Sequence, residues 1–119
     1  MKVQRGDVVL VDYPFSDGSG SKVRPTVVVQ ADEWNARLDD TILAVVTSST
    51  RRRVATPTQF LVEIATNAGQ QTGLRGDSVV QCGNLATYAQ YRVIRVMGRL
   101  ANSHIDQLEE CLSASLGLV

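Results

Sequence analysis

Short apolar runs rich in β-branched residues recur along most of the sequence, separated by segments that contain Gly, Ser, Asp or Pro. Apolar runs of roughly four to eight residues between such turn-forming segments are typical of β-strands. We expect strands at Val8–Tyr13, Pro25–Gln30, Thr41–Thr47, Gln59–Ile64, Ser78–Cys82 and Val93–Leu100. This succession predicts a mainly β fold.

The sequence also predicts the position of a proline and the structure of two connecting segments. Pro25 is expected at the first position of its strand, where a missing N–H is tolerated. Trp34–Asp40 is polar, which predicts a short helix or a loop, and Asn67–Gly76 is polar and contains glycine, which predicts a loop.

The periodicity changes near the C-terminus. Apolar residues recur there at i, i+3, i+7 and i+11, on one face of a helix, namely at Ile105, Leu108, Leu112 and Leu116. Ser103 is expected to cap the start of this helix and Gly117 to end it. The chain has 119 residues, the length of one domain spanning 1–119. We therefore predict a small, partly closed β-barrel of about five to seven strands with a C-terminal α-helix packed on it.

Charge and hydropathy narrow the class of protein. Twelve basic and twelve acidic side chains give a formal net charge of zero, which argues against binding to nucleic acid by bulk charge alone but leaves room for a local basic groove. The start of the chain has no signal-peptide pattern. No apolar run reaches the roughly 18 residues that a membrane span needs. We expect a cytoplasmic protein that does not enter a membrane.

The inventory of reactive side chains disfavours conventional catalytic centres. The one histidine, His104, lies at the start of the expected helix, where we expect it on the solvated surface rather than beside a nucleophile. Cys82 and Cys111 stand in apolar stretches, which is typical of buried cysteines, and no Cys/His cluster has metal-ligand spacing. Asp39 and Asp40 are expected at a solvated edge. The sequence therefore predicts neither a metal nor a cofactor.

Two groups of residues remain as candidates for a functional site, a pair of basic residues and a pair of hydroxyl residues. Strand alternation places Lys22 and Arg24 on one side of the chain just before the apolar part of the second expected strand, and Thr47 and Ser48 end the third apolar strand. A guanidinium offers a fork of N–H donors and a threonine offers one O–H, so that neighbouring strand ends bearing both can hold a phosphate. The pattern alone leaves a second interpretation open, in which Arg24 is a surface cation and Thr47 merely ends a strand.

Several segments resemble one protein family in the same order along the chain. Arg5–Phe15 and Gly20–Val29 closely resemble the opening of the MazF/PemK toxins of bacterial type II toxin–antitoxin systems. The resemblance continues through four later segments, which are Ala44–Ser48, Asp77–Val80, Asn84–Thr87 and Leu112–Val119. It implies an SH3-like barrel with a C-terminal helix, a homodimer, and a metal-independent endoribonuclease that cleaves single-stranded RNA, above all mRNA. It also implies a cognate antitoxin whose C-terminal segment covers the active groove.

The resemblance also assigns roles to residues. The family's catalytic arginine falls on Arg24 and its catalytic threonine or serine on Thr47. We further predict RNA contacts from a set of polar and basic residues, namely Lys22, Ser19, Gly20, Ser21, Ser48, Asn84 and Arg51. Some family members carry a carboxylate just after the strand that corresponds to Ser78–Cys82. This chain has none there, and Asn84 is the hydrogen-bonding group that could replace part of it.

Without a metal or a well-placed histidine, the simplest chemistry uses the substrate's own nucleophile. The RNA 2′-hydroxyl attacks the adjacent phosphorus and leaves a 2′,3′-cyclic phosphate and a 5′-hydroxyl, while the protein aligns the attack and stabilises charge. Three other interpretations remain open. These are a CcdB-like toxin of the same fold that poisons DNA gyrase, an inactive homologue that only binds an antitoxin, and a small barrel used for protein contact.

Overall fold

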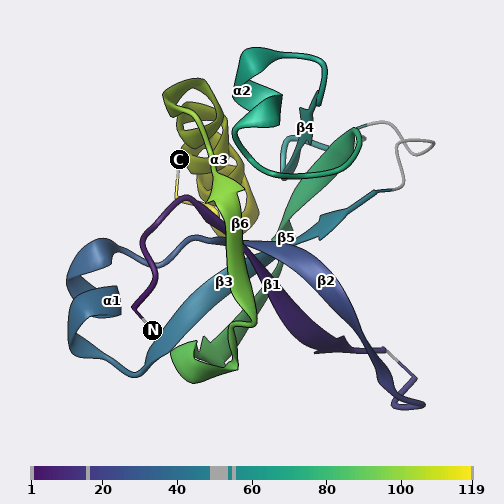
Figure 1. Cartoon of the computed structure of the whole chain (residues 1–119). Coiled ribbons are helices and arrows are strands. Elements are labelled where there is room, and N and C mark those ends of the chain that lie inside the picture. The colour runs from purple at the N-terminus through teal and green to yellow at the C-terminus, as the bar shows by residue number, and fades with distance from the viewer. Residues whose placement is uncertain (1, 16, 49–53, 55, 119) are drawn as a thin grey trace.

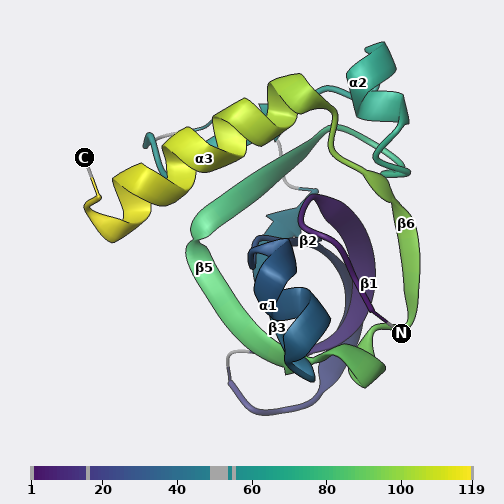
Figure 2. The same cartoon turned by 90° about the vertical axis from the view of Figure 1, so that its left-hand side faces the viewer.

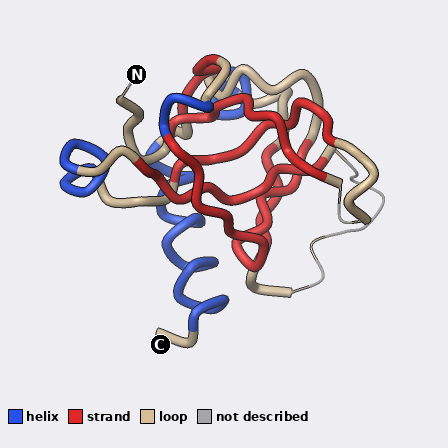
Figure 3. The backbone as a smooth tube through the Cα atoms, turned by 90° about the horizontal axis from the view of Figure 1, so that it is seen from below, coloured by secondary structure: helices blue, strands red, loops and turns tan. Residues whose placement is uncertain are grey.

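The structure is a computed structural model that describes residues 2–15, 17–48, 54 and 56–118. Within these ranges, six strands form one antiparallel sheet in the order β4-β5-β3-β2-β1-β6, curled into a half-barrel (Figures 1 and 2). The elements in chain order are β1 (Asp7–Pro14), β2 (Ser21–Val28), α1 (Asp32–Arg37), β3 (Asp40–Thr47), β4 (Gln59–Val62), α2 (Asn67–Gln70), β5 (Ser78–Ala89), the 3-10 turn η1 (Gln90–Arg92), β6 (Arg95–Arg99) and α3 (Asn102–Leu116). The predicted β architecture with a C-terminal helix is confirmed (Figure 3).

Apolar side chains fill both faces of the curled sheet. Alternation along β1 sends Val8 to one face and Val9 and Val11 to the other, and all three are fully buried. The outer core, on the Val8 face, packs against Leu108 of α3, and the inner core includes Leu43. Figure 2 shows α3 lying along the outside of the sheet beside β5, while α1 covers one end of the half-barrel. Each such side chain withdrawn from water contributes about 1.5–3 kcal/mol, so both faces stabilise the sheet.

The fifth strand is longer than expected because it continues through a bulge. β3 pairs Ala44 with Leu85 but Val45 with Gln81, so the three residues from Cys82 to Asn84 lie between consecutive partners. The sequence predicted an end at Cys82, because Gly83 and Asn84 disfavour strands. The structure instead keeps the strand and displaces these residues from the ladder, as bulges do. Asn84 is thereby exposed at the sheet surface.

Two further expectations about the strands and loops are wrong. β2 starts at Ser21, so Pro25 lies within the strand and pairs with Leu10 rather than opening it. It is tolerated there because the pairing of β2 with β3 begins only at Thr26, which leaves that edge without a ladder at Pro25. Inside the expected loop 67–76, Asn67–Gln70 forms α2, whose first turn is capped by the Thr66 hydroxyl accepting from the Gly69 N–H at 2.9 Å.

The terminal helix differs from its prediction at its start and in its buried face. α3 begins at Asn102 after Ala101, and no side chain caps it, so Ser103 lies inside the first turn. Its buried residues are His104, Leu108 and Cys111. The surface position predicted for His104 is therefore wrong, since the imidazole packs against Phe60 with ring centroids 6.1 Å apart. Burial also lowers the pKa of His104.

Other expectations about the C-terminal region are confirmed. Gly117 ends α3 in the left-handed conformation with φ 68°, as predicted. Cys82 and Cys111 are both buried free thiols, as predicted. None of the helices in the described ranges combines the length and the hydropathy that a bilayer crossing requires.

Candidate active site

The β1–β2 hairpin carries most of the site. Its two strands pair Tyr13 with Lys22 and Val11 with Arg24, which places Tyr13 and Arg24 on the same inward face. The connecting loop is shaped by its own hydrogen bonds, with the Phe15 N–H donating to the Gly20 carbonyl at 2.7 Å. Gly18 has a φ of 75°, a left-handed conformation that glycine adopts without steric cost. The tight loop thus brings its polar groups beside the end of the hairpin.

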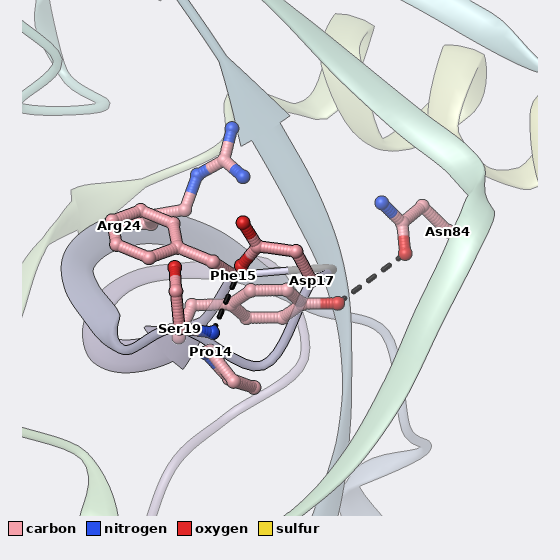
Figure 4. Close-up of a pocket in the computed structure, with 7 residues that line it drawn as sticks. Pro14, Phe15, Asp17, Ser19, Arg24 and Asn84 are labelled. Carbon is pink, nitrogen blue, oxygen red and sulfur yellow. Dashed lines mark hydrogen bonds between the residues drawn. The ribbon is translucent and has the colours of Figure 1, made fainter.

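An open cleft of about 730 Å³ lies between this hairpin and the bulge of β5 (Figure 4). The residues that line it are Tyr13, Pro14, Phe15, Asp17, Ser19, Arg24 and Asn84. Three members of the predicted site, Arg24, Ser19 and Asn84, therefore meet in one cleft although they come from three different segments.

Arg24 is the basic residue among the described residues that line the cleft. Its side chain is half-buried, and its Cζ atom lies 5.8 Å from the centroid of the Tyr13 ring. It forms no salt bridge with the acidic residues of the described ranges, in contrast to Arg5, Arg37 and Arg99. The guanidinium therefore keeps its donors available for an anion that enters the cleft.

Thr47 is the last residue of β3 and pairs with Val79 of β5. The ladder between β2 and β3 ends at the pair Thr26–Val45. Arg24 and Thr47 each lie two residues beyond that pair, so strand alternation places them on the same face as Thr26 and Val45. Thr47 is half-buried, as Arg24 is.

Ser48 lies elsewhere. It follows Thr47 and lines a second cavity of about 340 Å³, together with residues that include Leu10, Pro25 and Arg95. These residues belong to the opposite face of the sheet, which separates Ser48 from the cleft that contains Arg24.

The remaining predicted contacts lie along the hairpin or outside the described ranges. Lys22 and Gly20 are exposed on the hairpin. Ser21 is also exposed, and its hydroxyl donates to the Asp12 carboxylate at 2.9 Å. Arg51 falls outside the residues that the structure describes.

The cleft contains polar and aromatic groups that the sequence did not single out as site residues. Asp17 brings a carboxylate into the cleft from the hairpin side, and on the β5 side, where some family members carry a carboxylate, this chain has the Asn84 amide. Hydrogen bonds from Ser19 hold the pKa of Asp17 below its usual value, which keeps it ionised. Phe15 exposes 43% of its surface. Sequence pattern misses these residues because the loop that gathers them has no periodicity.

No three His, Cys, Asp or Glu side chains of the described ranges gather as a metal-binding group. Among the described residues, the cleft offers instead one arginine, a carboxylate, an amide and exposed aromatic surface. Such a set suits a ligand that carries a phosphate together with an apolar, hydrogen-bonding ring.

The chain matches known proteins over nearly its whole length. Residues 4–116 match the sequence model of the family described as the PemK-like, MazF-like toxin of type II toxin–antitoxin systems. Endoribonuclease MazF9 of Mycobacterium tuberculosis is 32% identical over 120 aligned positions, which cover 98% of both chains. Endoribonuclease EndoA of Bacillus subtilis is 28% identical over 120 positions, which cover 100% of this chain and 98% of the relative.

Solved structures share the fold. A mycobacterial endoribonuclease in complex with its cognate antitoxin superposes with a TM-score of 0.76 at 20% identity, over 98% of this chain and 97% of that one. MazF in a MazE–MazF complex from Deinococcus radiodurans gives a TM-score of 0.73 at 17% identity, over 98% of both chains. Because the family match spans nearly the whole chain, this protein belongs to the PemK-like, MazF-like toxins of type II toxin–antitoxin systems.

Proposed function

We propose that this toxin is a metal-independent endoribonuclease that cleaves single-stranded RNA, with Arg24 and Thr47 as its catalytic residues and residues 1–119 acting as a single toxin domain. One observation carries the proposal. Arg24 faces an open cleft without a salt-bridge partner in the described ranges, on the same sheet face as Thr47. The curated relatives that match over the whole chain are endoribonucleases.

The chemistry follows from these groups. The 2′-oxygen of the RNA forms a bond to the adjacent phosphorus as it loses its proton, and the bond from phosphorus to the 5′-oxygen breaks as that oxygen gains one. The products are a 2′,3′-cyclic phosphate and a 5′-hydroxyl. Arg24 stabilises negative charge on the non-bridging oxygens, and Thr47 donates a hydrogen bond to the phosphate or the attacking ribose.

The rest of the hairpin and the bulge bind the flanking nucleotides. Lys22 attracts the phosphates of the RNA backbone. Hydrogen bonds to the RNA backbone or to the bases come from Ser19, Gly20, Ser21 and Asn84. Ser48, which follows β3, and Arg51 are two further residues that we assign to RNA contacts. The net charge of zero means that this attraction is local rather than spread over the molecule.

The cellular setting follows from the family. Solved relatives include a mycobacterial endoribonuclease and a Deinococcus radiodurans MazF, each in complex with its antitoxin. We infer that this chain acts as a homodimer in the cytoplasm and is held inactive by a cognate antitoxin whose C-terminal segment covers the Arg24 cleft.

Cleavage of a short single-stranded RNA in excess EDTA tests the proposal. We expect cyclic phosphate and 5′-hydroxyl ends, a loss of about 10²–10³ in rate for Arg24→Ala, and normal rates for the control Arg37→Ala on α1. An RNA with a 2′-deoxy sugar at the cleavage site should bind without being cut. Loss of cutting in EDTA, full activity of Arg24→Ala, or cleavage of the deoxy substrate would each overturn the mechanism.

The same assay separates the rival functions. Cutting of purified RNA in the absence of gyrase excludes a gyrase poison as the explanation of toxicity. A wild-type protein that binds an antitoxin but cuts no RNA would identify an inactive homologue.

A further inference from the structure

We propose that Tyr13 is a positioning residue for Arg24, its ring serving as the seat that orients the guanidinium toward the scissile phosphate. This inference rests on the proposed function, because it assumes that Arg24 acts on RNA.

The contact between the two side chains is direct. The Arg24 Cζ atom lies 5.8 Å from the centroid of the Tyr13 ring, within the range of about 6 Å in which a cation is attracted to an aromatic face. Val11 pairs with Arg24 and Tyr13 with Lys22, so Tyr13 and Arg24 are diagonal neighbours on one face of the hairpin. Both members of the contact therefore lie on two adjoining strands, β1 and β2.

An aromatic seat suits a catalytic arginine better than a carboxylate does. A carboxylate partner would occupy the N–H donors of the guanidinium in a bidentate pair. A ring beside the guanidinium holds it through its π-electrons and leaves the N–H edges open to a phosphate. Arg24 has no salt-bridge partner in the described ranges, and the Tyr13 ring is the neighbour that we assign to orienting it.

The seat is itself fixed at two points. The Tyr13 hydroxyl donates to the Asn84 Oδ1 at 3.3 Å. The ring stacks on Tyr88, with centroids 6.1 Å apart and an angle of 16° between the planes. A ring held at both its edge and its face loses little further freedom when substrate binds, which is the condition for a pre-organised site.

Tyr88, on which the Tyr13 ring stacks, belongs to the inner core. Tyr88 is 6% exposed and its hydroxyl donates to the Asp12 carbonyl at 3.2 Å. The Arg92 Cζ atom lies 4.7 Å from the centroid of the Tyr88 ring. Arg24, Tyr13, Tyr88 and Arg92 therefore form a continuous series of ring and guanidinium contacts that runs from the cleft to η1. Arg24 stands at the end of this series that opens into the cleft.

Three variants test the seat in steady-state RNA cleavage. Tyr13→Leu removes the ring, Tyr13→Phe keeps the ring but removes the bond to Asn84, and Tyr91→Leu is a matched control at a tyrosine that is 82% exposed. We expect Tyr13→Leu to lower kcat by about tenfold to hundredfold with KM changed by less than about threefold, because a misplaced catalytic group slows chemistry more than binding. Tyr13→Phe should keep most of kcat, and Tyr91→Leu all of it.

A graded series of fluorinated phenylalanines at position 13 provides the measurement that a merely structural role would not move. Fluorine withdraws charge from the ring face while nearly preserving its shape, so kcat should fall stepwise with fluorination while the melting temperature stays constant. This series also keeps the inference testable if Tyr13→Leu does not fold.

The outcomes are distinguishable from failure of the proposed function. If Arg24→Ala cleaves RNA normally, the assignment of Arg24 is wrong whatever Tyr13 does. If Arg24→Ala is inactive but kcat is unchanged across the fluorinated series, the seat alone is refuted. A rise in KM without a fall in kcat would also refute it, because the ring would then bind a base rather than orient the arginine.

Discussion

Tyr13 of β1 and Asn84 of the β5 bulge are joined by a hydrogen bond in which the phenol hydroxyl donates to the amide Oδ1 at 3.3 Å. The bond connects the two walls of the cleft across 71 positions of sequence. Because the amide oxygen is engaged, the Asn84 NH₂ group remains as the donor that faces the cleft.

Asn84→Asp should weaken RNA binding. The substitution keeps the acceptor for Tyr13 but places a second negative charge beside Asp17 in a cleft that we propose receives phosphates. We expect KM to rise by about tenfold at low ionic strength and the effect to shrink with added salt, since exposed charges are screened. The matched control is Asn102→Asp, which adds the same charge at the exposed start of α3. An unchanged KM for Asn84→Asp would show that the amide does not face the RNA.

His104 should make stability depend on pH. Burial lowers its pKa below the ordinary 6.5, so the unfolded chain takes up a proton more readily than the folded one. The stabilisation is fully present above about pH 6.5 and is lost as the pH falls toward the lowered folded pKa. Urea unfolding between pH 7.5 and pH 5 should therefore show a declining free energy of unfolding, and His104→Gln should flatten the decline. Because the chain has one histidine, an equally steep decline in the variant would contradict this assignment.

Cys82 should resist thiol reagents in the folded protein. Burial, with a smaller effect of the neighbouring Cys111, raises the pKa of its thiol to about 12. The reactive thiolate is then scarce at neutral pH, and the reagent has no access to it. We expect labelling by a disulfide reagent to be slow in buffer and rapid in urea, whereas an added cysteine at the exposed position of Ser103 should react at once. Rapid labelling of native Cys82 would contradict the packing of α3 on β5.

Gly98→Ala should destabilise the fold. A Cβ at Gly98 would collide with the carbonyl of Gln71 and the backbone of Thr72, where β6 passes the turn after α2. Backbone cannot yield as a side-chain end can, so we expect a loss of about 1–3 kcal/mol in the free energy of unfolding. Gly76→Ala is the matched control, because a Cβ there meets nothing within 4 Å. Chemical denaturation of both variants decides the point, and equal stability would show that the approach is looser than described.

The parts of the fold that sequence could predict are those with a local signal. β1, β3 and α3 follow from β-branched runs and from helical periodicity. The continuation of β5 past Gly83 could not be predicted, because a bulge overrides the low strand propensity of Gly and Asn through pairing with a distant strand. The burial of His104 was missed for a similar reason: the face of α3 is chosen by its contact with β4 and β5, not by its most apolar stripe.

The residues of the site also fall into those that the sequence could predict and those that it could not. Arg24 stands out in the sequence because a basic residue precedes Pro25 and an apolar strand. Tyr13 did not, because an aromatic residue next to a strand is more commonly a core residue than a binding residue. Its role depends on Asn84 and Tyr88, which lie far along the chain, and only the three-dimensional arrangement brings these groups together.

The position of β5 late in the chain determines when the active site is completed during synthesis. The β1–β2 hairpin is local and can close early in synthesis, but the opposite wall of the cleft and the ring beneath Tyr13 are both supplied by β5. A nascent chain that still lacks this strand would carry Arg24 on an unfinished surface. The nascent toxin would thus be inactive until translation is well past its midpoint. Its activity would begin only once the later part of the chain had left the ribosome.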